Sequence, residues 1–117
     1  MTDRRRRAER RGRIAETAAA LLLRAKGYSI LAQRFAAPGG EIDIVARRGG
    51  VLVFAEVKFR RSLAEARLAV TARGRARIKS ASAAWLARRG ERMDVPLRFD
   101  LIAVSPRGIR HLPDAFR

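Results

Sequence analysis

The residues best suited to chemistry lie in one segment, EIDIVARRGGVLVFAEVKF, which runs from residue 41 to residue 59. Three carboxylates and one lysine interrupt its apolar runs: Glu41, Asp43, Glu56 and Lys58. Charged groups in such surroundings are costly unless they are paired or bind something. Neighbouring acids raise one another's pKa unless a cation lies between them, and Mg²⁺ or Mn²⁺ accepts oxygen ligands of this kind. The four residues therefore indicate a metal site that acts on a phosphate.

A hairpin would bring these four residues together. Gly49-Gly50 suits a two-residue turn between strands over residues 41–47 and 51–59. Counting outward from that turn pairs Asp43 with Glu56, and Glu41 with Lys58. Opposite residues share one face of a sheet, as do residues two apart on one strand. A three-residue loop would break this arrangement, and a plain salt-bridge patch is the alternative interpretation.

The N-terminal part predicts a basic arm followed by a helix. Residues 1–13 (MTDRRRRAERRGR) carry almost nothing apolar and predict a flexible arm or the frayed start of a helix. Residues 14–26 have helical periodicity, and Gly27 would end the helix. We do not expect a signal peptide, because Glu16 interrupts the apolar stretch and charged residues follow it. The most apolar face of the helix carries Ile14, Ala18, Leu21, Leu22 and Ala25 and is expected to be buried. Ala19, Ala20 and Leu23 lie near Glu16 on another face, which leaves a second covered side open.

The remaining segments predict an α/β fold with a small mixed sheet. We expect strands over 28–36 and 97–104 and a second helix over 71–89, with Trp85 in the core. Residues 62–70 fit either a short helix capped by Ser62 or a loop. Residues 109–112 form a candidate edge strand that ends before Pro113. Residues 14–117 would then form a single domain, a small mixed sheet with two flanking helices.

The charge balance points to a polyanionic partner. Lys and Arg total 27 against 11 acids, a net charge of +16, which favours nucleic acid. No cysteine is present, which excludes thiolate zinc and disulfides and favours the cytoplasm. No apolar run is long enough for a transmembrane helix, so we expect no membrane partner. The single histidine, His111, argues against zinc and is expected on the surface or an edge strand.

Asp43 followed by Glu56-Val57-Lys58 resembles the D…(D/E)xK signature of the PD-(D/E)XK nuclease superfamily. The chain as a whole, from about residue 10, resembles the YraN-type family of small bacterial proteins, usually described as candidate endonucleases. One departure is Gly74, where the family usually has a lysine. The matching positions are Gly12, Ala15-Glu16, Gly27-Tyr28, Gly40 to Asp43, Phe54 to Lys58 and Arg98 to Asp100.

The resemblance implies an αβββαβ restriction-endonuclease-like core, similar to archaeal Holliday junction resolvases. It implies Asp43 and Glu56 as ligands of Mg²⁺ or Mn²⁺ and Lys58 as the catalytic lysine. Glu16 and the carbonyl of Val57 would be further ligands. Related resolvases are dimers, which makes a homodimer a hypothesis here.

Other charged residues have roles that are less defined. Glu41 matches the family, and it either supports the site or forms a salt bridge. Asp100 either supports the metal ligands or pairs with an arginine, and we favour the pairing. Arg73, Arg75 and Arg77 on the second helix are expected to hold the phosphate backbone without reading base sequence.

Three functions remain open on these grounds. The first is a metal-dependent endonuclease that acts on nucleic acid, DNA in preference to RNA, with structure-specific cleavage as one form. The second is a non-catalytic nucleic-acid-binding module that keeps the nuclease fold. The third is an interaction protein whose basic surface meets an acidic protein or lipid. The intact acids and lysine favour the first, because residues this costly need a function to retain them.

Overall fold

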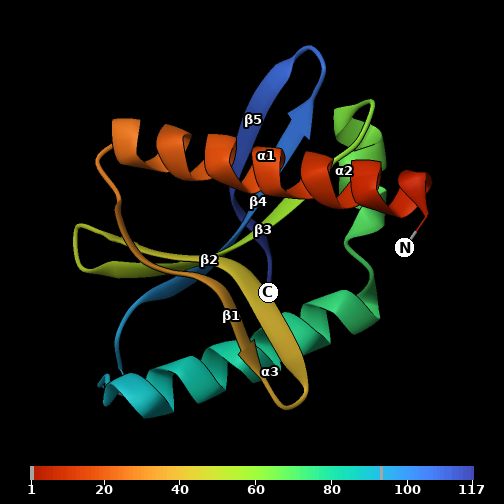
Figure 1. Ribbon diagram of the computed structural model, residues 1–117. Coiled ribbons are helices and arrows are strands. Elements are labelled where there is room, and N and C mark those ends of the chain that lie inside the picture. The colour runs from red at the N-terminus through yellow and green to blue at the C-terminus, as the bar shows by residue number, and fades with distance from the viewer. Residues whose placement is uncertain (1, 93) are drawn as a thin grey trace.

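The computed structural model describes residues 2–92 and 94–117. Its helices are α1 (Asp3–Ala25), α2 (Leu63–Ala69) and α3 (Ala72–Arg89). Its strands are β1 (Ser29–Ala37), β2 (Gly40–Arg48), β3 (Val51–Phe59), β4 (Leu97–Ser105) and β5 (Gly108–Phe116). The strands form one sheet in the order β1-β2-β3-β4-β5, and α1 and α3 lie on its opposite faces (Figure 1).

The sheet is mixed because one of its connections is a crossover. Strands β3 and β4 pair in parallel, whereas the other neighbouring pairs are antiparallel. Parallel neighbours cannot be joined by a tight turn, and α2 and α3 supply the connection between them. This confirms the predicted α/β fold, with an αβββαβ core and an additional C-terminal strand.

The β2–β3 hairpin has the predicted two-residue turn. Gly49 and Gly50 both have positive φ, +57° and +80°, a conformation that glycine adopts without steric cost. The ladder begins at Arg48 opposite Val51 and ends at Ile44 opposite Ala55. The register is therefore the one counted from the sequence. It places the next residue of each strand, Asp43 and Glu56, where the ladder stops.

The buried face of α1 is not the one that periodicity predicted. Ala15, Ala19, Ala20 and Leu23 are buried against the sheet, whereas Ile14 and Leu21 are each 59% exposed. Two apolar stripes run along this helix, and the sequence prediction chose the stripe with the larger side chains. The alanine stripe packs on the sheet because small side chains let the helix backbone approach the strands closely.

Helix α1 also begins earlier than predicted. It starts at Asp3, so most of the expected flexible arm is helical. The Thr2 side chain caps the helix by accepting a hydrogen bond from the Arg5 N–H (3.2 Å), and Asp3 places a negative charge in the first turn. Arginine is itself a good helix former, which is why a basic run can continue the helix.

Helix α3 covers the other face of the sheet and carries the predicted core residues. Ile78, Ala81 and Trp85 are buried, and the Trp85 ring packs edge-on against Phe54 (5.9 Å between centroids). The helix begins very close to β2. A Cβ atom on Gly40 would lie 2.0 Å from the carbonyl oxygen of Arg77, so only glycine fits there. This contact brings the first turns of α3 over the start of β2.

For two segments, the structure decides or extends what the sequence predicted. Ser62 does cap a short helix, since its hydroxyl accepts the Glu65 N–H at 3.2 Å. Strand β5 continues past Pro113 to Phe116, which corrects the predicted end. A proline is tolerated there because β5 is an edge strand. In the part of the chain that is described, no helix has the length and apolarity to cross a membrane.

Candidate active site

The four charged residues of the β2–β3 hairpin line one pocket. Glu41 and Asp43 come from β2, and Glu56 and Lys58 from β3. The first turns of α3 close the pocket, with Arg77 among the residues that line it. The pocket has a volume of about 170 Å³, which suits a small polar group and its waters. The predicted grouping of these side chains is therefore confirmed, while their chemical roles stay predictions.

Asp43 has the most unusual environment in this pocket. Burial raises the pKa of its carboxyl to about 8, and the negative charge of the neighbouring Glu56 adds to the rise. The backbone N–H of Val57 donates a hydrogen bond to Asp43 Oδ2 (2.8 Å), which favours the charged form and partly opposes the rise. Two acids thus share a site that disfavours two negative charges.

Glu56 and Lys58 form an ion pair within the same pocket. Lys58 Nζ lies 3.2 Å from Glu56 Oε1, and both side chains are mostly buried. The two residues are two apart on β3, so they point to the same face of the sheet. The lysine therefore places one positive charge beside the acid pair. It does not remove the conflict at Asp43, whose pKa remains raised.

Glu16 approaches the acids from α1, with a partner that the sequence did not predict. Arg34 Nε donates to Glu16 Oε1 at 3.0 Å, and the negative charge of Glu16 contributes to the raised pKa of Asp43. Arg34 lies in β1 with φ of +54°, a conformation uncommon for a residue with a side chain. Between its neighbours Gln33 and Phe35, it lies across from Asp43 on β2.

Arg34 could have been found only from the correct alignment of β1 with β2. A β-bulge shifts the register between Ile30 and Ala32, so counting along the sequence does not give the correct partner. The hydrogen bond that Arg34 donates to Glu16 raises the pKa of Arg34, an exposed residue, and the negative charges of Glu16, Asp43 and Glu41 contribute to the rise. Arg34 is therefore part of the electrostatic surroundings of the acid pair.

The pocket offers a divalent cation an incomplete set of oxygen ligands. Over residues 2–92 and 94–117, no group of three or more His, Cys, Asp or Glu side chains is arranged to hold a metal ion. Mg²⁺ nevertheless binds through one or two carboxylates, with waters and substrate phosphates completing its shell. The Asp43–Glu56 pair fits that mode, because a cation would relieve the unfavourable charge that raises the Asp43 pKa.

The three arginines predicted to hold phosphate occupy different places around the start of α3. Arg77 is exposed and lines the acid pocket. Arg73 is exposed on the helix and does not line this pocket. Arg75 is half-buried, and its Nη1 donates to the carbonyl oxygen of Val70 (3.2 Å) in a separate cavity. Only Arg77 is thus placed to meet a phosphate beside the acids.

Comparison with known proteins agrees with the sequence resemblance. The model of the uncharacterised protein family UPF0102 matches residues 15–104. The chain belongs to the UPF0102 family. It is 51% identical over 108 residues to the UPF0102 protein of Rhizobium meliloti (strain 1021), covering 92% of this chain and 88% of the relative. With the UPF0102 protein of Methylorubrum extorquens (strain PA1), it shares 51% identity over 114 residues, 97% of this chain and 89% of the relative.

The UPF0102 match covers every residue of the acid pocket. It runs from Ala15, before Glu16 on α1, to Val104 at the end of the β4 core. The resemblance to the YraN-type family is thereby confirmed. The family description gives no activity, so the chemistry of this UPF0102 chain must be argued from its pocket.

Asp100 lies within the UPF0102 match but outside the acid pocket. It pairs in register with Ala55, so it lies on the α1 face of the sheet, opposite to the pocket. Arg98 donates two hydrogen bonds to its carboxylate (both 2.8 Å), His111 Nε2 lies at 2.7 Å, and the Asp114 N–H donates at 2.9 Å. The predicted pairing with an arginine is confirmed.

His111 lies on the edge strand β5, one of the two positions expected from the sequence, and its side chain is buried in this network. Its side chain is 3% exposed, and it contacts Asp100 through one ring nitrogen and Lys26 Nζ through the other. The partners come from α1, β4 and β5, so no local pattern could reveal them. Within the described residues, no hydrogen bond or ion pair links Asp100 to the acid pocket, and we find no support there for a role behind the metal ligands.

Proposed function

We propose that this protein is a metal-dependent nuclease that hydrolyses phosphodiester bonds of nucleic acid, DNA in preference to RNA. One observation carries the proposal: Asp43 and Glu56 share a pocket that raises the Asp43 pKa, with Lys58 beside them. Acids kept in such an unfavourable arrangement are typical of functional sites. The basic surface supports a polyanionic substrate, because the net charge is +16.

Each residue of the pocket has a task in such a reaction. Asp43 and Glu56 would hold Mg²⁺ or Mn²⁺, and Glu16 and the Val57 carbonyl are further candidates as ligands. When bound, such a cation supplies a more acidic water and neutralises charge on the phosphate. Lys58 lies where its ammonium group can orient the attacking water or hold a phosphate oxygen.

The surroundings of the pocket would position the substrate. Arg77 lines the pocket from α3 and can pair with a phosphate oxygen. The first turn of α3 contains no acidic residue, so nothing there repels the backbone of the nucleic acid. Arg34 would position Glu16 through their hydrogen bond rather than touch the substrate. Glu41 is exposed, lines the pocket and has no assigned step.

The test is cleavage of linear, flapped and four-way-junction DNA and RNA in Mg²⁺, Mn²⁺ or chelator. We expect wild type to cut only with metal, and Glu56→Gln and Lys58→Ala to lose about 10²–10⁴-fold in rate, the range typical of removing a catalytic group. Glu9→Gln is the matched control, an exposed acid on α1 outside the pocket. It should cut like wild type.

Two results would contradict the proposal. Cleavage that persists unchanged in Glu56→Gln and Lys58→Ala would show that another nuclease in the preparation is responsible. Binding without cleavage, with affinity falling steeply as salt rises, would favour the nucleic-acid-binding module instead.

A further inference from the structure

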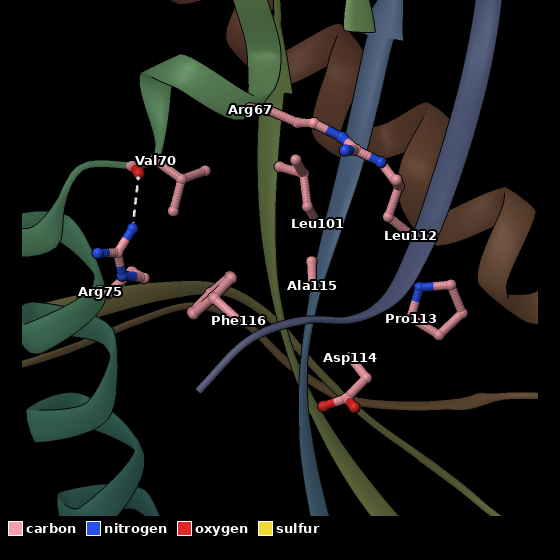
Figure 2. A pocket seen from close by; sticks show the side chains of 9 residues that line it. All are labelled: Arg67, Val70, Arg75, Leu101, Leu112, Pro113, Asp114, Ala115 and Phe116. Carbon is pink, nitrogen blue, oxygen red and sulfur yellow. Dashed lines mark hydrogen bonds between the residues drawn. The ribbon is translucent and has the colours of Figure 1, made fainter. Parts of the chain in front are cut away.

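A second cavity lies beside the acid pocket. It has a volume of about 360 Å³ and lies between α2, the start of α3 and the last two strands (Figure 2). Its size is at the lower end of the range of small-molecule sites, about 300–1,000 Å³. None of the residues that line it lines the acid pocket. The cavity therefore needs an explanation of its own.

Two guanidinium groups border this cavity at separate places. Arg67 comes from α2, is exposed, and extends toward Leu112 of β5 in Figure 2. Arg75 comes from α3, lies apart from it beside Val70, and donates a hydrogen bond to the Val70 carbonyl, which leaves other N–H groups of its guanidinium for a ligand. Among the described residues, neither arginine forms a salt bridge with an acid. Each arginine is suited to a phosphate.

The wall between the two arginines is apolar and ends in an acid. Leu101, Leu112, Pro113 and Phe116 form the apolar wall, and the Phe116 ring is held by stacking on Phe99 outside the cavity (5.6 Å between centroids). Asp114 lies at the edge of this wall, where its Oδ2 accepts a hydrogen bond from Arg117 (3.2 Å) (Figure 2). Its carboxylate has further acceptor positions, which can bind the amino group of a base.

This lining defines the occupant. A ligand that fits combines an anionic group with a flat, largely apolar group that carries hydrogen-bond donors. A nucleotide has that composition, with its phosphate at one of the arginines and its base against the apolar wall. A metal ion or a plain phosphate would use only one side of the cavity, and an acidic peptide would leave the apolar wall without a matching group.

The two cavities lie next to each other on the same face of the sheet. Leu101 in the wall of the second cavity is the register partner of Glu56 in the acid pocket. Neighbouring strands are about 4.8 Å apart, so the two sites can serve adjacent positions on one strand of nucleic acid. Both also border the first turns of α3, through Arg75 in one and Arg77 in the other.

We infer that the Arg67–Arg75 cavity receives one unpaired nucleotide next to the phosphodiester that is cut. This inference rests on the proposed nuclease function. A base within a duplex cannot enter a cavity of this size unless it is unpaired and unstacked, at a cost that is least where the strand is already single. The preferred substrate class is therefore nucleic acid with an unpaired strand beside the cleavage position, rather than an intact duplex.

The test measures binding in chelator, so that cleavage does not enter. Fluorescence anisotropy would compare a flapped duplex with a fully paired duplex of equal length, each with the full chain. Arg67→Ala removes one guanidinium, and Leu112→Trp fills the cavity without changing the charge. Arg107→Ala is the matched control, because it removes an exposed arginine from the β4–β5 turn outside the cavity. Thermal midpoints equal to that of wild type would verify that each variant is folded.

We expect Arg67→Ala to weaken flap binding about tenfold and duplex binding less than twofold, the loss expected for one charge-assisted hydrogen bond. Leu112→Trp should weaken flap binding more than duplex binding, because it occupies the space that the unpaired base would fill. Arg107→Ala should weaken both substrates equally. Equal losses on flap and duplex in Arg67→Ala and Leu112→Trp would overturn the inference. Cleavage data separate the two proposals. Metal-dependent cutting without preferential binding of the flap would contradict only the role of the Arg67–Arg75 cavity. Cavity-dependent binding of the flap without any cutting would contradict only the nuclease function.

Discussion

Two aspartates on opposite faces of one sheet, one fully buried and one half-buried, show how differently the same residue type can be used. Asp100 is fully buried on the α1 face, and Asp43 lies in the pocket on the α3 face. Burial alone would raise the pKa of Asp100, but hydrogen bonds from Arg98, His111 and the Asp114 N–H outweigh it and lower that pKa. At Asp43, burial and the charge of Glu56 act together and raise the pKa to about 8.

The difference teaches how to separate a structural acid from a functional one. The surroundings of Asp100 supply cations and donors that satisfy its charge, so nothing further is needed from solution. The surroundings of Asp43 supply another acid, and the charge is satisfied only if something binds. Burial is therefore a poor guide to function by itself, and the sign of the pKa shift is the better one.

Removing Asp100 should produce the largest loss of stability. Asp100→Ala leaves Arg98 and His111 without their shared partner and orphans the Asp114 N–H. Breaking a buried ion pair in this way costs about 3–5 kcal/mol. Urea unfolding at pH 7 should show this decrease in the free energy of unfolding.

The matched substitution on the other face is Asp43→Ala, which should cost much less. It removes a carboxylate whose charged form the pocket disfavours. If the two substitutions destabilised the protein equally, the distinction between a satisfied and an unsatisfied acid would be wrong.

The pH dependence of stability should have opposite signs at the two acids. Because the folded pKa of Asp43 is raised, the native state binds a proton more tightly than the unfolded chain, and stability falls as pH rises from about 4 to about 8. Asp43→Asn avoids this penalty, so in chelator it should be more stable than wild type at pH 8.5. The advantage should vanish near pH 4, where both side chains are neutral.

Asp100→Asn provides the contrast in the same experiment. The folded pKa of Asp100 is lowered, so its contribution is present above the unfolded pKa and is lost as pH falls through the folded pKa. Asp100→Asn should therefore be less stable than wild type at neutral pH and approach it only in acid. Unfolding curves for Asp43→Asn that stay below those of wild type at pH 8.5 would contradict the raised pKa.

The sequence was sufficient for the acid pocket because the pocket depends on local geometry. Gly49-Gly50 determines the hairpin register as far as Ile44 opposite Ala55, and Asp43 and Glu56 are the next residues of their strands and line one pocket. The closing contact with α3 was not visible in the sequence. It depends on Gly40, where the helix backbone approaches the strand, and a glycine after Pro38-Gly39 looks like an ordinary turn residue.

The features that the sequence missed are those that depend on long-range packing. Both apolar stripes of α1 have helical periodicity. Packing against the strands buries Ala15 and Ala19 rather than Ile14 and Leu21. The burial of His111 depends on partners from three different elements. The whole length of a basic helix could not be predicted from periodicity, because charged residues carry no apolar pattern.

A divalent cation should stabilise the protein only through the acid pair. A ligand that binds only the folded state adds RT ln(1 + [L]/Kd), about 1.4 kcal/mol at ten times the dissociation constant. Thermal unfolding of wild type with Mg²⁺ or Mn²⁺ should show this gain, larger at pH 8.5 than at pH 6, because protons compete for Asp43. Glu56→Gln should lose the gain, whereas Glu9→Gln should keep it. An equal rise in all three proteins would mean that the cation acts elsewhere, and the contrast between the two faces of the sheet would then have no functional meaning.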